Sequence, residues 1–86
     1  TMKSFDYVIT DAEGIHARPA GELVKAAKAF TSSVKITKDG KTVDGKKLFG
    51  LMGLAVKQGN KVTVTVEGED EEKAAESLEV FMKENM

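Results

Sequence analysis

The spacing of apolar residues changes repeatedly along this chain, between a period of two and a spacing of three to four. Near the start, Phe5, Tyr7 and Ile9 occupy alternate positions, which predicts a strand over about residues 3–10 with one apolar face. From Ala17 the spacing becomes helical. The inward stripe of that predicted helix comprises Ala20, Leu23, Val24, Ala27 and Phe30.

The same kind of pattern predicts four further elements. Alternating Val34 and Ile36 predict a second strand, and the pair Asp39-Gly40 favours a tight hairpin turn into a short strand over residues 42–44. A fourth strand is predicted at residues 62–66, where valine and threonine alternate. The last element is a helix with acidic residues at its start, whose predicted inward stripe comprises Ala75, Leu78, Phe81 and Met82.

The segment between Lys46 and Val56 holds more apolar residues than one narrow helical stripe needs. One interpretation is a short helix buried on several sides. The other is a helix that leaves apolar side chains exposed as a surface for a partner protein. The pattern alone leaves both interpretations open. The residues concerned are Leu48, Phe49, Leu51, Met52, Leu54 and Val56.

The order of elements predicts one α+β domain over residues 1–86, with its helices packed on one face of a sheet. A chain of 86 residues can bury one core and has no room for an enclosed substrate chamber, so its functional site should lie on the surface. Thr1 precedes the first methionine, and we interpret it as an added residue without a functional role.

Composition excludes several classes of function. The net charge of −1 argues against nucleic acid as a partner. The absence of cysteine and the presence of a single histidine argue against a metal site, and nothing in the sequence suggests a cofactor. No segment resembles a signal peptide or reaches the roughly 18 apolar residues of a membrane span, so we expect a cytoplasmic protein without membrane insertion.

His16 is the candidate reactive residue. It stands directly before the predicted helix, where the backbone N–H groups of Ala17 and Arg18 have no partners within the helix and the helix dipole favours an anion. Arg18 adds a permanently charged donor suited to phosphate oxygens. Pro19 fits the first helical turn. These features together favour a phosphoryl group bonded to His16.

The same positive surroundings should lower the pKa of His16 and keep the imidazole neutral and nucleophilic. Glu13 opposes this effect unless its carboxylate points into solvent, which is the orientation that we expect. From the residues alone, a different interpretation competes with this one. A single histidine at the junction of a loop and a helix is more often a cap or a surface residue than a nucleophile.

The string Gly14-Ile15-His16-Ala17-Arg18-Pro19-Ala20 resembles the active-site signature of HPr, the histidine-containing phosphocarrier of the bacterial sugar phosphotransferase system. The resemblance extends over nearly the whole chain, including Leu48-Phe49 and the segment Glu67–Glu71. It implies an open-faced sandwich in which three helices cover one face of a four-stranded antiparallel sheet. It also implies that His16 accepts the phosphoryl group on Nδ1, with Arg18 as its electrostatic partner. Enzyme I would be the donor and EIIA domains the acceptors.

The resemblance assigns roles to other residues as well. It implies that Leu48, Phe49 and Met52 dock on both partners, and that Lys25 and Lys28 form a basic rim that speeds the encounter. Lys47 stands where Gram-positive relatives carry a regulatory serine, so phosphorylation at that position is excluded here. Ala55 stands where relatives commonly have glycine, so the end of the short helix should differ.

The function expected from this resemblance is that of a monomeric carrier with a phosphohistidine intermediate rather than that of a free-standing enzyme. An alternative is a regulatory paralogue of HPr that acts mainly through protein contacts, and the loss of the serine at Lys47 leaves room for it.

Overall fold

The secondary structure has the order that the sequence predicts. The computed structural model describes residues 2–10 and 17–85 of the chain. Its elements are β1 (Lys3–Val8), α1 (Ala17–Lys28), β2 (Ser33–Lys38), β3 (Lys41–Asp44), α2 (Leu48–Gly53), β4 (Lys61–Glu67) and α3 (Glu71–Asn85). The predicted first strand extends two residues beyond β1, although Ile9 still donates its N–H to the carbonyl of Asn60, the residue that continues the register of β1 with β4.

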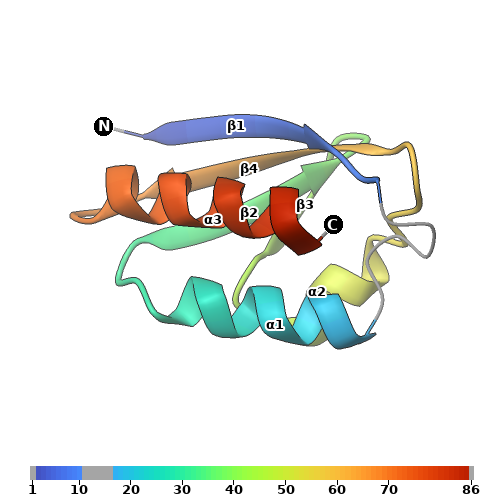
Figure 1. Cartoon of the computed structure of the whole chain (residues 1–86), viewed down its shortest axis with the longest axis horizontal. Helices are drawn as coiled ribbons and strands as arrows, with labels where there is room; N and C mark the ends of the chain where they lie inside the picture. The colour runs from blue at the N-terminus through green and yellow to red at the C-terminus, as the bar shows by residue number, and fades with distance from the viewer. Residues whose placement is uncertain (1, 11–16, 86) are drawn as a thin grey trace.

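The four strands form one antiparallel sheet in the order β1-β4-β2-β3. The helices lie on one face of this sheet, with α3 and α1 side by side beneath it (Figure 1). This arrangement confirms the α+β class and the open-faced sandwich. At the predicted hairpin, Asp39 and Gly40 have φ angles of 51° and 78° and join the paired residues Lys38 and Lys41.

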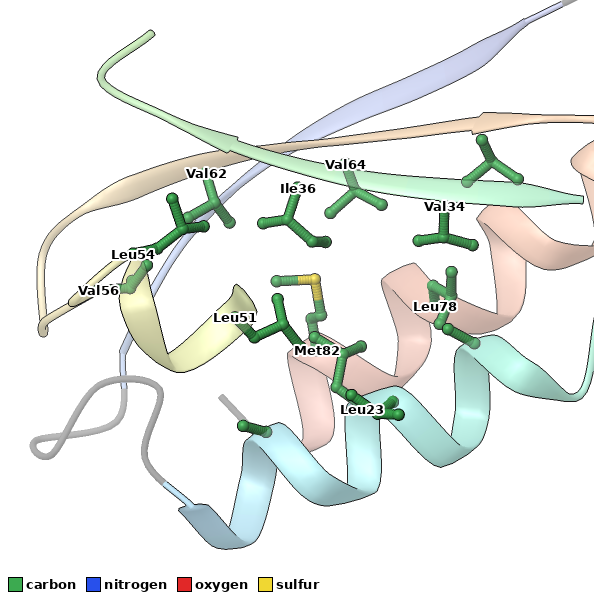
Figure 2. Packing of buried hydrophobic residues seen from close by; sticks show 14 of the residues in the cluster. Leu23, Val34, Ile36, Leu51, Leu54, Val56, Val62, Val64, Leu78 and Met82 are labelled. Carbon is green, nitrogen blue, oxygen red and sulfur yellow. The ribbon is translucent and has the colours of Figure 1, made fainter. Parts of the chain in front are cut away.

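The core lies between the sheet and the helices (Figure 2). Alternate residues of β2 and β4 point into it, because side chains of a strand alternate between the two faces of a sheet. Leu23 of α1, Leu51 of α2 and Leu78 of α3 meet them from the helical layer. The strand residues concerned are Val34, Ile36, Val62, Val64 and Val66, each at most 1% exposed.

The predicted inward stripe of the C-terminal helix needs a correction. Ala74, Leu78 and Met82 are the buried apolar residues of α3, and they succeed one another at intervals of four. Ala75 and Phe81 are only partly buried, at the margin of the core. In α1 the predicted stripe is buried from Ala20 to Ala27. Phe30, its expected last member, lies beyond the end of the helix and is half-buried.

At one end of the molecule, the turn after α1 meets the turn before α3. A Cβ atom on Gly68 would lie 2.6 Å from the Ser32 Cα atom, so only glycine fits there without displacing backbone. The Asp70 carboxylate accepts hydrogen bonds from the N–H groups of Thr31 and Ser32, at 3.0 and 2.9 Å, and from the Ser32 hydroxyl. These contacts join the two turns.

Candidate functional site

The predicted reactive residue, His16, lies outside the described residues, as does Glu13. Helix α1 begins at the next residue, Ala17, as the sequence predicts, so Ala17, Arg18 and Pro19 form its first turn. The first N–H groups of an α-helix have no acceptor four residues earlier within the helix. The backbone therefore provides, next to His16 in the sequence, the helix N-terminus on which the predicted phosphate site depends. The side chain of Arg18 is outside the described part.

Helix α2 combines both interpretations of the apolar segment after Lys46. On its inner side Leu51 is fully buried. Leu54 and Val56, which follow the helix in the chain, are 4% and 3% exposed. On its outer side Phe49 is 87% exposed and Met52 is 40% exposed. Leu48 lies between these extremes, partly buried against the core. We call Leu48, Phe49 and Met52 the α2 surface.

The fold places α2 next to the end of α1 that adjoins His16 in the sequence. In Figures 1 and 2, α2 lies beside the N-terminal half of α1. Helix α2 also contacts β3, the edge strand of the sheet. The helix N-terminus at Ala17 and the α2 surface are thus on neighbouring elements. A partner that covers the α2 surface would also approach the N-terminal end of α1.

The predicted basic rim is more distant from α2. Lys25 and Lys28 are both exposed, and both lie in the last turn of α1, at the opposite end of that helix from Ala17. The structure therefore places these two lysines on the same helix as Arg18 but does not group them with the α2 surface.

Lys47 is the N-cap residue of α2. Its backbone is extended, with φ −118° and ψ 114°, and its side chain makes no capping hydrogen bond. A lysine side chain has no acceptor atom, so it cannot satisfy the N–H groups of the first helical turn. The carbonyl of Lys47 does accept the N–H of Leu51, at 3.1 Å.

Two lysines without a predicted role, Lys38 and Lys46, contact the chain just after a helix. The Nζ atom of Lys38 donates to the carbonyls of Leu54 and Ala55, at 3.2 and 3.0 Å, just beyond α2. The Nζ atom of Lys46 donates to the carbonyl of Phe30, at 2.9 Å, just beyond α1. The contacts of Lys38 with Leu54 and of Lys46 with Phe30 each join residues 16 apart in the sequence, and no local pattern marks them.

Within the described ranges 2–10 and 17–85, no group of three or more acidic, cysteine or histidine side chains is arranged so that it could hold a metal ion. Among the helices of the same ranges, none has the length and apolar character needed to cross a bilayer. The described part offers instead the N-terminal end of α1, which directly follows His16 in the sequence, and an exposed apolar surface on the neighbouring helix α2.

Comparison with known proteins gives consistent results. The family model described as "PTS HPr component phosphorylation site" matches residues 3–84. The phosphocarrier protein HPr of Lysinibacillus sphaericus is 43% identical over 83 residues, which cover 96% of this chain and 94% of that protein. The crystal structure of HPr from Bacillus anthracis superimposes with a TM-score of 0.88 at 38% identity, covering 94% of this chain and 96% of that one.

A second kind of relative also matches. The crystal structure of Crh, the catabolite repression protein of Bacillus subtilis, superimposes with a TM-score of 0.78 at 42% identity. The match covers 93% of this chain and 92% of the Crh chain, and that structure is described as a dimer with a swapped domain.

Proposed function

Because this chain belongs to the HPr family of phosphocarriers of the phosphotransferase system, we propose that it accepts a phosphoryl group on His16 from phospho-Enzyme I and passes it to sugar-specific EIIA domains in the cytoplasm. The observation that carries the proposal is the helix N-terminus at Ala17, the residue directly after His16 in the sequence. A phosphate bonded to His16 would meet the first N–H groups of α1 and the positive end of the helix dipole there.

The chemistry needs a neutral imidazole. The lone pair of one ring nitrogen of His16 attacks phosphorus, and the bond between phosphorus and the donor breaks as the new P–N bond forms. The backbone N–H groups of Ala17 and Arg18 and the Arg18 guanidinium would stabilise the charge on the phosphoryl oxygens. In the second transfer an EIIA nucleophile attacks the same phosphorus and His16 leaves, so the site must stabilise the phosphohistidine only moderately.

The α2 surface supports a docking role. Phe49 is almost fully exposed. A small protein has little apolar surface to bury, so leaving this side chain in water gives up stability that its burial would provide. A surface that repeatedly binds and releases partners accounts for this exposure. Lys25 and Lys28 would act before docking, by attracting acidic partner surfaces.

The first prediction concerns His16 itself. Incubation with phosphoenolpyruvate and Enzyme I should add one acid-labile phosphoryl group to each chain, as measured by intact mass. The His16→Ala variant should show no gain, because the acceptor nitrogen is gone, while its circular dichroism stays that of the parent. Lys47→Ala is a matched control that should still be phosphorylated. A parent protein that gains no phosphoryl group, or a His16→Ala variant that gains one, would contradict the proposal.

A regulatory function resembling that of Crh is the second candidate, favoured by the 42% identity to that protein. The two candidates differ in a simple measurement. A carrier restores sugar phosphorylation when mixed with Enzyme I and an EIIA domain, whereas a regulator binds a partner outside transport and fails in that assay. In either case Lys47 offers no hydroxyl, so an ATP-dependent HPr kinase should leave residue 47 unmodified.

We also propose that the chain meets its partners as a monomer, since exposed docking residues are expected on a protein that visits several partners. The Crh structure makes a swapped dimer the alternative. Light scattering at micromolar and millimolar concentrations distinguishes the two states, because a dimer would double the measured mass.

A further inference from the structure

Helix α2 has few internal means of fixing its orientation. It contains six residues, Leu48–Gly53, and its N-cap residue Lys47 makes no side-chain capping bond. Short helices in proteins depend on tertiary contacts rather than on their own hydrogen bonds. Leu51 anchors the inner side in the core (Figure 2). Leu54, the C-cap residue, is also buried, at 4% exposed, so the core holds the helix from below at both residues. Polar contacts at the helix ends further restrict its direction.

The C-terminal end of α2 is closed by irregular backbone. The N–H groups of Leu54 and Ala55 donate to Leu51 and Met52, three residues earlier, at 3.2 Å each. Ala55 then has a φ angle of 53°, a left-handed conformation that glycine adopts freely and alanine does not. This end of the helix therefore carries local strain, and a contact to its carbonyls adds to the hold that the buried Leu54 side chain provides.

Lys38 supplies that contact. It is the last residue of β2, and its Nζ atom donates to the carbonyls of Leu54 and Ala55 at 3.2 and 3.0 Å. The carbonyls after the last turn of a helix lack intrahelical donors, and the helix dipole makes this end negative. The ammonium group of Lys38 supplies both the missing donor and a positive charge. The contact attaches the end of α2 to the β2–β3 hairpin.

We propose that Lys38 is a positioning residue for docking: by holding the end of α2 it fixes the direction in which Phe49 and Met52 point. This inference rests on the proposed function, because it assumes that the α2 surface binds Enzyme I. Without the Lys38 bonds, α2 would sample several orientations. Only a fraction of the molecules would then present the docking surface correctly, and the apparent affinity would fall by that fraction.

The test is the steady-state kinetics of phosphorylation by phospho-Enzyme I, in which this protein is the substrate. The Lys38→Met variant keeps the length of the side chain and removes its donor. We expect KM to rise by about 3- to 10-fold, a change of the size that the loss of hydrogen bonds to the Leu54 and Ala55 carbonyls can cause, with kcat unchanged. Lys38→Arg should restore most of the affinity because it keeps a charged donor.

Lys41→Met is the matched control. Lys41 is exposed and pairs with Lys38 across the same hairpin, so its removal changes the net charge equally without breaking the contact to α2. Amide hydrogen exchange at Leu54 and Ala55 gives a readout that does not need Enzyme I. Exchange there should become faster in Lys38→Met and should stay at the parent rate in Lys41→Met.

The Phe49→Ala variant separates the two proposals. If it leaves KM unchanged, the docking role of the α2 surface is wrong, and the inference about Lys38 is wrong with it. If Phe49→Ala raises KM but Lys38→Met behaves as Lys41→Met does, docking stands and only the inference is overturned. Faster exchange in Lys38→Met with an unchanged KM overturns it equally, since Lys38 would then hold α2 without affecting docking.

Discussion

At the scale of single residues, Asp70 is the side chain whose ionisation the fold changes most clearly within the described part of the chain. The hydrogen bond from the Ser32 hydroxyl and the bonds from the N–H groups of Thr31 and Ser32 lower the pKa of Asp70 from 3.8 to about 2. All three donors favour the charged carboxylate. The contact ties the turn before α3 to the turn after α1, so its protonation state affects the stability of the fold.

The direction of this shift determines the pH dependence. The pKa of Asp70 is lower in the folded chain than in the unfolded one, so its stabilising effect is complete above about pH 4 and is lost as the pH falls towards 2. We expect the midpoint of chemical unfolding to decrease over this range in the parent. Asp70→Asn should be less stable at pH 7 and should show a flatter dependence between pH 4 and 2.

Glu69→Gln is the matched control, because it neutralises the exposed neighbouring carboxylate and leaves the contact of Asp70 with Ser32 in place. The unfolding midpoint of Glu69→Gln should equal that of the parent at each pH. If Asp70→Asn and Glu69→Gln change the acid dependence by the same amount, overall charge rather than this contact accounts for the loss of stability.

At the scale of elements, Lys47 leaves the start of α2 without a side-chain cap. Its backbone already has the extended conformation of an N-cap residue, so a serine there can accept an N–H from the first turn without rearrangement. We expect Lys47→Ser to raise the free energy of unfolding by about 1 kcal/mol. Urea denaturation measures this change.

The control for this prediction is Lys47→Gln, which removes the same charge but introduces a residue that is a poor N-cap. If the serine and glutamine variants are equally stable, the gain comes from removing a positive charge near the helix N-terminus and not from capping.

The elements also show how far the sequence determines the fold. The hairpin at Asp39-Gly40 and the start of α1 at Ala17 were predictable because local spacing and turn chemistry determine them. The buried role of Ala74 was less visible, since alanine fits either side of a helix and the final packing decides. Lys38 was not predictable as a contact of α2. Its partner Leu54 lies 16 residues away, and a lysine at the end of a strand is usually solvated.

The candidate site was also predictable only in part, because local spacing indicates an apolar surface but tertiary packing decides which side chains form it. Excess apolar residues after Lys46 indicated an exposed surface, but only the packing of Leu51 and Leu54 in the core identifies Phe49 and Met52 as its outward members. The pattern could not show that Leu48 would be partly buried, because its position at the start of α2 depends on how that helix meets α1 and β3.

At the scale of the whole molecule, a net charge of −1 conceals an uneven distribution. From Glu67 to the end, the chain carries eight of its fourteen acidic residues and two of its thirteen basic ones, Lys73 and Lys83. Most of this negative segment is α3, whereas Lys25 and Lys28 belong to α1. The position of a charge should therefore influence association more than the total charge does.

Two double variants with the same net charge test this idea. Lys25→Gln with Lys28→Gln removes positive charge from α1, and Lys73→Gln with Lys83→Gln removes it from α3. If acidic partners approach the α1 side, the first pair should lower the association rate with Enzyme I several-fold at low salt, and the second should change it little. Stopped-flow association rates measured at low and high ionic strength check this.

The difference between the two double variants should shrink as salt screens the charges, because the Debye length falls to about 3 Å at 1 M. Equal effects of the two pairs would show that the α1 lysines have no special role in the encounter.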